Sequence, residues 1–145
     1  MRNRSQYVSI DSSTSCPSPV ASGVPQGSVL GPTLFLIFIN DICDVTSNLN
    51  VKCKLFADDL KIYATRSRHD LNTIDHLNIA LSRIESWCSL WQLNLAPEKC
   101  SVLKISMTKP PLNPEPRFYI LNGRQINKCS YIRDLGVLGL IHLFA

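Results

Sequence analysis

The chain has 145 residues, and its 15 lysines and arginines against 11 acidic residues give a formal net charge of +4. With 45% hydrophobic residues, it has the apolar fraction of an ordinary globular protein, which argues against disorder throughout. A chain of this length fits one domain and can bury about two thirds of its unfolded surface. The mild positive charge permits a nucleic-acid partner without requiring one.

The six cysteines and the apolar stretches indicate in which cellular compartment the protein is expected and whether it crosses a membrane. No CxxC pair and no zinc-like Cys/His spacing occurs in the sequence. Sparse cysteines favour reduced thiols and therefore an intracellular compartment, because secreted disulfide scaffolds are denser in cysteine. The charged start, residues 1–4, is followed by no apolar signal segment. The longest apolar stretch, residues 29–39, is interrupted and shorter than the ~20 residues of a membrane span. We therefore expect no membrane partner.

The first third of the chain predicts little regular structure before one helix. Residues 6–10 alternate polar and apolar side chains, which predicts a short strand. Residues 11–22 are rich in Ser, Thr and Pro and are expected to form a loop. Pro32 suits the first turn of a helix that continues through residues 34–42. That helix is apolar nearly all round, so we expect it to be buried.

A hairpin follows. Apolar and polar residues alternate from Val51 to Leu55 and again from Leu60 to Tyr63. Period two on both sides of Asp58 and Asp59 predicts two antiparallel strands joined at an acidic tip.

The next segment predicts a long helix. Asp70 is a candidate N-cap, and apolar residues then recur at steps of three and four as far as Trp91. This spacing makes Trp87 and Trp91 core residues rather than platforms for stacking bases.

The last third predicts strands and turns. We expect a strand near residues 102–105, a loop over the proline-rich residues 108–116, and a hairpin over residues 118–126 that turns at Asn122-Gly123. A last strand is expected over residues 135–138. The predicted fold class is therefore α+β, an antiparallel sheet with helices packed on one face.

The acidic tip is the main candidate for chemistry. Adjacent carboxylates repel one another, and a divalent cation removes that repulsion. Mg²⁺ prefers such hard oxygen ligands and commonly takes one or two carboxylates together with substrate phosphates. Neighbouring strand residues point to opposite faces, so only one of Asp58 and Asp59 is expected to face a reaction centre squarely. The pair alone equally fits a solvated turn, because Asp is common in turns.

Four segments together resemble a known family. They are Ser22-Gly23-Val24-Pro25-Gln26-Gly27-Ser28-Val29-Leu30-Gly31-Pro32, Phe56-Ala57-Asp58-Asp59, the segment from Trp91 to Cys100, and Asp134-Leu135-Gly136-Val137. In this order they resemble the reverse transcriptase of non-LTR retrotransposons of the LINE or jockey-like type. The resemblance covers essentially the whole chain, and it implies that residues 1–145 are a partial reverse transcriptase domain in the polymerase palm.

The resemblance also implies roles for individual residues. It implies an RNA template, a DNA primer, deoxynucleotide triphosphates and two Mg²⁺ ions, with Asp58 as the main metal ligand and Asp59 beside it. It places three other groups near the substrates: Gln26 and Gly27 against the nascent base pair, Lys99 at the triphosphate, and Leu135 and Gly136 on the primer. From the residues alone, Lys99 equally fits a solvated surface lysine. The seven basic residues between Lys99 and Arg133, against the single acid Glu115, fit either a nucleic-acid flank or a solvated face.

The sequence also departs from the family pattern. The family's upstream carboxylate has no counterpart here, since Asp11 lies in a Ser/Thr-rich segment, and Met1 is expected to fall inside the domain. The thumb is not recognised either, and residues 138–142 depart from the family after the LGV segment. We therefore expect weak or no Mg²⁺ binding and no polymerisation by the isolated chain. Two alternatives stay open: a non-catalytic nucleic-acid-binding remnant, and a structural α+β domain with an incidental acidic turn.

Overall fold

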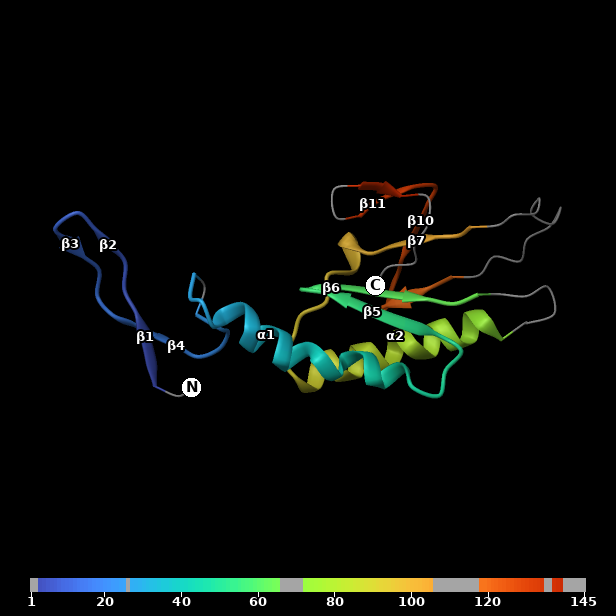
Figure 1. Cartoon of the computed structure of the whole chain (residues 1–145), viewed down its shortest axis with the longest axis horizontal. Helices are drawn as coiled ribbons and strands as arrows, with labels where there is room; N and C mark the ends of the chain where they lie inside the picture. Colours follow the sequence, from blue (N-terminus) through green and yellow to red (C-terminus); the bar gives the residue numbers. More distant parts are fainter. Residues whose placement is uncertain (1–2, 26, 66–71, 106–117, 135–136, 140–145) are drawn as a thin grey trace. The chain divides into compact units, whose positions relative to one another are not determined.

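The computed structural model describes residues 3–25, 27–65, 72–105, 118–134 and 137–139 (Figure 1). The chain divides into two compact units, Met1–Ile39 and Asn40–Ala145. Helices and paired strands occur in both units, so the expected α+β class is confirmed. None of the helices in the described ranges has the length and hydropathy that a bilayer crossing requires.

The first unit begins with two short antiparallel ribbons. Strand β1 (Arg4–Gln6) pairs with β4 (Ser18–Val20), and β2 (Ser9–Ile10) pairs with β3 (Ser13–Thr14). The predicted single strand over residues 6–10 and the predicted loop over 11–22 are therefore wrong. The chain reverses at Asp11, whose φ is 52°, a left-handed conformation that Asp tolerates better than most residues. Proline in β4 is compatible with this pairing because an edge strand leaves one side unpaired.

Helix α1 (Gly31–Ile39) ends the first unit. Pro32 lies in its first turn, as predicted. The expected burial of this helix is wrong, because only Gly31 and Ile39 are buried while Leu36 is 50% and Ile37 69% exposed. The described strands β1 to β4 are themselves almost entirely exposed, so these strands form no apolar core in which the helix could be buried. The chain then forms a 3₁₀ helix, η1 (Asn40–Thr46), where an α-helix was expected to continue to residue 42.

The second unit contains the predicted hairpin. Strand β5 (Lys52–Phe56) pairs antiparallel with β6 (Asp59–Tyr63), and the register sets Cys53 opposite Ile62 and Leu55 opposite Leu60. These four side chains form the inner face of the hairpin, on which Leu60 and Ile62 are buried. The opposite face carries the charged side chains of Lys52, Lys54, Asp59 and Lys61, together with the aromatic rings of Phe56 and Tyr63.

Helix α2 (Thr73–Leu90) is the longest element of the second unit. Its N-cap is Asn72, whereas the predicted cap Asp70 lies outside the described residues. It packs against η1 and β8, and the Arg83 guanidinium donates hydrogen bonds to the carbonyls of Val45 (3.0 Å) and Ser47 (3.1 Å). Its buried face follows the predicted stripe of three- and four-residue steps: Thr73, Leu77, Ala80, Leu81, Ile84, Trp87 and Cys88.

Short strands complete the unit. After the 3₁₀ turn η2 (Pro97–Lys99) come β7 (Ser101–Leu103), β8 (Ile120–Leu121), β9 (Arg124–Gln125), β10 (Asn127–Cys129), β11 (Ile132–Asp134) and β12 (Val137–Gly139). The predicted hairpin at Asn122-Gly123 is confirmed as β8–β9. The predicted last strand is β12, although residues 135 and 136 lie outside the described ranges, as does the predicted loop over 108–116.

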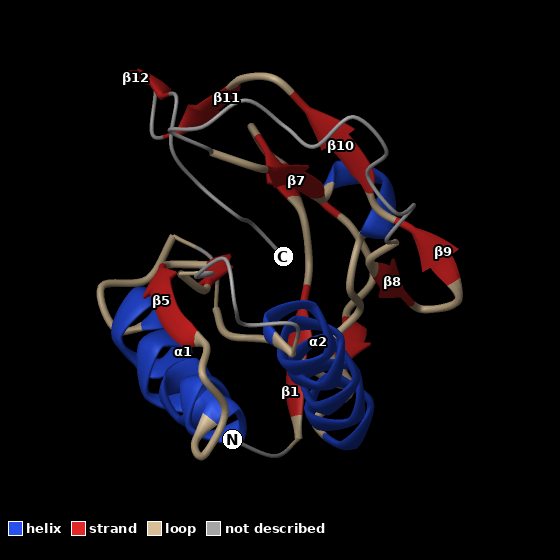
Figure 2. Cartoon of the chain, turned by 90° about the vertical axis from the view of Figure 1, so that its right-hand side faces the viewer, coloured by secondary structure: helices blue, strands red, loops and turns tan. Residues whose placement is uncertain are grey.

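The pairing of β7 corrects the expected sheet. Strand β10 runs parallel to β7, from Ser101 opposite Asn127 to Leu103 opposite Cys129 (Figure 2). The other pairs among the described strands are antiparallel, and each pair stands as a separate two-stranded sheet. A single antiparallel sheet with helices on one face is therefore not formed by the described strands. Val102, Leu103, Leu121 and Ile126 are buried, and β8, which carries Leu121, packs against α2.

Candidate active site at the acidic hairpin

The acidic tip is a two-residue turn. Ala57 and Asp58 occupy its centre, and Phe56 lies opposite Asp59 in the first strand pair. Ala57 has a φ of 51°, while Asp58 is outside the positive-φ region. A positive φ at only the first central residue is the pattern of a type II′ turn, a turn type whose twist suits a hairpin. The left-handed conformation is unfavourable for alanine because its Cβ crowds the backbone. The turn therefore holds a strained residue immediately before the two carboxylates.

Both carboxylates of the tip are exposed, so solvent or a ligand can reach them. Asp58 belongs to the turn, whereas Asp59 begins β6 and lies on the outer face of the hairpin. Two adjacent, exposed carboxylates form a hard-oxygen donor set, which fits Mg²⁺. No cluster of three or more His, Cys, Asp and Glu side chains that could hold a metal ion occurs within the described ranges. Within those ranges, the hairpin therefore offers at most these two acidic ligands.

The outer face of the same hairpin is basic beyond the tip. Lys54 lies directly opposite Lys61, and Lys52 lies opposite Tyr63 in the next pair on that face. Lys52 and Lys54 are exposed and Lys61 is half-buried. None of these lysines belongs to a motif that marked candidate site residues in the sequence. Their alternation with the apolar inner residues was the available signal, since period two places them together on one face.

The glycine-rich block of the first unit forms a tight turn before α1. The Ser28 hydroxyl donates to the Pro25 carbonyl at 2.7 Å and accepts from the Gly31 amide at 3.0 Å. A Cβ on Gly31 would lie 2.7 Å from the Pro25 carbonyl oxygen, so only glycine fits there without a shift. Gly27 requires glycine for a different reason, its φ of 77°. It is exposed, as a residue that brings bare backbone to a ligand must be.

The other predicted site residues are distributed as follows. Lys99 is exposed at the end of η2, where its amide donates to the Ala96 carbonyl at 2.9 Å. Gln26, Leu135 and Gly136 lie outside the described residues. The structure brings Asp58 and Asp59 together in one hairpin of the second unit, whereas Gly27 belongs to the first unit.

The two tryptophans differ in their surroundings. Trp87 is buried, with 8% of its surface exposed, whereas Trp91 is 44% exposed just beyond the end of α2. Their ring centroids lie 5.9 Å apart with the planes tilted by 38°. The expected core position is confirmed for Trp87 and is wrong for Trp91. Helical spacing placed Trp91 on the buried stripe, but the helix ends one residue earlier.

The cysteines carry free thiols, and three of them have altered acidity. Burial raises the pKa of Cys53 in β5, and the hydrogen bond and charge of the neighbouring Cys43 thiol raise it further. Burial also raises the pKa of Cys88 and, together with the Glu98 carboxylate, that of Cys100. These thiols are therefore poor nucleophiles at neutral pH, because the thiolate is the reactive form.

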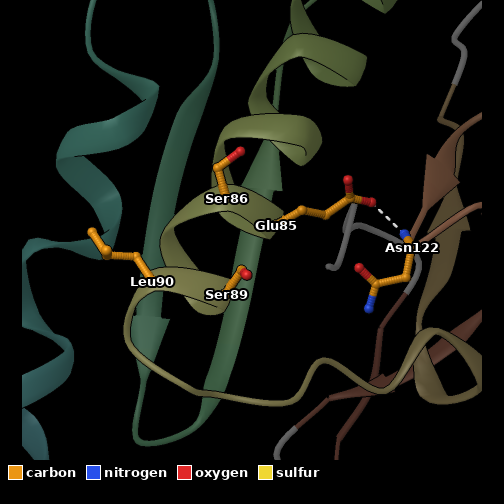
Figure 3. A pocket seen from close by; sticks show the side chains of 5 residues that line it. All are labelled: Glu85, Ser86, Ser89, Leu90 and Asn122. Carbon is orange, nitrogen blue, oxygen red and sulfur yellow. Dashed lines mark hydrogen bonds between the residues drawn. The ribbon is translucent and has the colours of Figure 1, made fainter.

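A separate open hollow lies beside α2. Its volume is about 540 Å³, and it is lined by Glu85, Ser86, Ser89, Leu90 and Asn122 (Figure 3). The Glu85 carboxylate accepts a hydrogen bond from the backbone N–H of Asn122 at the tip of the β8–β9 hairpin. Neither Asp58 nor Asp59 is among the described residues that line this hollow. Glu85 thus anchors the β8–β9 turn to α2, and no local sequence pattern predicts this contact.

The comparison with known proteins agrees with the resemblance seen in the sequence. The reverse transcriptase (RNA-dependent DNA polymerase) family matches residues 2–137, and the chain belongs to this family. The family named from the four motifs is therefore confirmed. No solved structure matches the chain significantly.

Individual relatives refine this assignment. The chain is 34% identical over 142 residues to the RNA-directed DNA polymerase from mobile element jockey of Drosophila melanogaster, covering 94% of this chain and 15% of that protein. It is 34% identical over 152 residues to the probable RNA-directed DNA polymerase from transposon X-element of the same fly, covering 93% of this chain and 16% of that protein. The chain therefore spans less than a fifth of the length of either relative.

Proposed function

We propose that residues 1–145 form part of the palm of a mobile-element RNA-directed DNA polymerase, at the point where a nucleotide is joined to a primer. The observation that carries this proposal is the strained turn that holds Asp58 and Asp59 exposed side by side, in a chain that belongs to the reverse transcriptase family. An RNA template, a DNA primer and deoxynucleotide triphosphates are the substrates of the complete enzyme in this proposal.

Asp58 and Asp59 are the residues that hold Mg²⁺ in this proposal. Their exposed carboxylates fit the metal, and Asp58 is the main ligand with Asp59 beside it. Two bound Mg²⁺ ions supply activation of the primer 3′-hydroxyl and stabilisation of the leaving pyrophosphate. The hairpin contributes rigidity, because the buried Leu60 and Ile62 fix β6 directly behind the tip.

The remaining candidate residues orient the substrates. Gly27 offers an exposed backbone without a side chain, next to Gln26, for close approach to the nascent base pair. Lys99 is an exposed cation suited to the triphosphate. Leu135 and Gly136 are assigned to the primer strand by the resemblance alone.

We further propose that the 145-residue chain by itself does not extend a primer. Two carboxylates of one hairpin clamp two cations poorly, and correct positioning of reactants alone supplies ~7–11 kcal/mol of a barrier. Primer extension on an RNA template with Mg²⁺ or Mn²⁺ tests this, and no incorporation is expected. Incorporation that disappears in Asp58→Asn would overturn the proposed inactivity.

The metal role is tested in a full-length polymerase that carries residues 2–137 in place of the matching segment of the jockey relative. Asp58→Asn is expected to lower kcat by at least ~10²-fold with little change in the KM for nucleotide, because it removes stabilisation specific to the transition state. Asp75→Asn, an exposed aspartate on α2, is the matched control and should leave kcat unchanged. Equal activity of Asp58→Asn and Asp75→Asn would contradict the proposed function.

A further inference from the structure

The turn of the β8–β9 hairpin contains the single Asn-Gly pair of the sequence, Asn122-Gly123. Both residues are exposed, and both have left-handed backbone conformations, with φ of 49° and 71°. An Asn-Gly pair can react within itself, because no Cβ on the glycine hinders its backbone nitrogen from reaching Cγ of the asparagine. This turn is therefore a candidate site of covalent modification.

The two reacting groups of the turn are not held by other parts of the protein. Within the described ranges, no hydrogen bond engages the carboxamide of Asn122 or the N–H of Gly123. The carboxamide lines the open hollow beside α2 and points away from the Glu85 carboxylate (Figure 3). A Cβ placed on Gly123 would meet no atom within 4 Å, so the space around the glycine is open. Ring closure between the two residues would thus break no hydrogen bond of the described chain.

We propose that Asn122 deamidates spontaneously in the folded chain, with the backbone nitrogen of Gly123 as the nucleophile. A bond forms between this nitrogen and Cγ of Asn122, and the bond from Cγ to Nδ2 breaks. The Nδ2 group leaves as ammonia with the proton of the Gly123 N–H, and a cyclic imide remains. Water then opens the imide at either of its carbonyls and yields aspartate or isoaspartate at position 122.

The modification would act on the contact between the hairpin and α2. The backbone N–H of Asn122 donates to the Glu85 carboxylate, and either product adds a second carboxylate to the residue that makes this contact. Like charges this close repel one another. Isoaspartate also lengthens the backbone by one atom, which disturbs the register of Leu121 with Arg124. Deamidation should therefore weaken the attachment of β8–β9 to α2, an effect separate from the function proposed for Asp58 and Asp59.

The reaction is tested by incubating the full chain at neutral pH and physiological temperature. Peptide mapping by mass spectrometry detects the mass gain when the carboxamide NH₂ is replaced by a hydroxyl, and methylation by a protein isoaspartate methyltransferase detects isoaspartate. The same chain unfolded in urea is the reference, because there the fold does not restrict ring closure. We expect Asn122 in the folded chain to react at a rate within about tenfold of the unfolded chain.

Controls for the reaction lie in the same chain. Asn127 is also exposed but is followed by a lysine in β10, so it should stay intact while Asn122 reacts. Asn122→Gln should stay unmodified, because the longer side chain closes its ring far more slowly. A folded rate at Asn122 more than about tenfold below the unfolded rate would overturn the inference, because the fold would then protect the turn. Equal rates at Asn122 and Asn127, or the absence of a cooperative urea transition in tryptophan fluorescence, would also contradict it.

The consequence for α2 is tested with Asn122→Asp, which reproduces the aspartate product. It should raise the equilibrium constant of unfolding by about fivefold, the effect of two neighbouring unit charges in water. Glu85→Gln keeps an acceptor for the backbone N–H and should remove most of this effect in the double variant. Asn127→Asp adds the same charge elsewhere in the unit, and its effect should not depend on residue 85. An effect of Asn122→Asp that is equal with Glu85 and with Glu85→Gln would exclude the proposed link to α2.

Discussion

The β5–β6 and β8–β9 hairpins are both closed by two-residue turns, yet they differ in the residues that occupy the left-handed positions. In β8–β9, Asn122 (φ 49°) and Gly123 (φ 71°) hold both central positions, which is the sequence and pattern of a type I′ turn. In β5–β6, Ala57 takes a φ of 51°. The β8–β9 turn uses residues suited to left-handed conformations, whereas the β5–β6 turn places an alanine in one.

The strands behind these turns differ in the same way. Leu121 of β8 is fully buried, and the Glu85 carboxylate of α2 accepts a hydrogen bond from the backbone N–H of Asn122. In β5–β6, Lys54 lies opposite Lys61, and Phe56 is 59% exposed beside the carboxylates. One hairpin is built for stability. The other carries strain, like-charge repulsion and exposed apolar surface at the position of the proposed chemistry, as expected where function competes with stability.

The largest expected effect is the loss of unfolding free energy when a buried or half-buried leucine of the two hairpins is truncated. Leu121→Ala should lower the free energy of unfolding of the second unit by about 2–5 kcal/mol, because it leaves a cavity at a fully buried site. Leu55→Ala, at a half-buried position of β5, should cost clearly less. Urea unfolding followed by tryptophan fluorescence measures both, since Trp87 and Trp91 lie in that unit. A larger loss in Leu55→Ala would mean that β5–β6 is the better anchored hairpin.

The turn residues should respond in opposite directions. Gly123→Ala should destabilise the unit by about 1–2 kcal/mol, because alanine is strained at a φ of 71°. Ala57→Gly should stabilise it by about 0.5–1 kcal/mol, the relieved strain exceeding the added flexibility of the unfolded chain. The same urea titrations measure both changes. Destabilisation by Ala57→Gly would show that the acidic turn is not strained.

The smallest expected effect is that of the lysine pair. Lys54→Thr should raise the free energy of unfolding by about 0.2–1 kcal/mol, because it removes a like-charge pair and introduces a residue that favours strands. The gain should shrink as NaCl screens the repulsion. Arg124→Thr, opposite Leu121 in β9, is the control and should show no such salt dependence. A gain that is independent of salt would exclude repulsion as its cause.

Local patterns predicted the parts of the fold that depend on neighbouring residues. The alternation around Asp58 and Asp59 gave the β5–β6 hairpin, Asn122-Gly123 gave the β8–β9 turn, and the three- and four-residue spacing gave most of the buried face of α2. Each of these signals lies within one element or one turn. The positions of the two aspartates could therefore be predicted, including their exposure at a hairpin tip.

Features that depend on distant partners could not be predicted in this way. The parallel pairing of β7 with β10 joins short segments whose composition favours no particular partner. The exposure of α1 depends on which other elements its unit contains, and the apolar sequence of the helix gives no information about them. The assignment of Gly27 to a different unit from Asp58 has the same origin, because motif order along the chain carries no information about compact units.

The parallel pairing of β7 and β10 also has a kinetic consequence. Antiparallel hairpins close within microseconds, whereas Ser101 can pair with Asn127 only after the intervening chain has been made and its ends brought together. At about 5–20 residues per second, synthesis leaves β7 without its partner on the order of seconds. During that interval Val102 and Leu103, both buried in the finished fold, remain open to off-pathway strand pairing, so this short segment is a point of aggregation risk for the nascent chain.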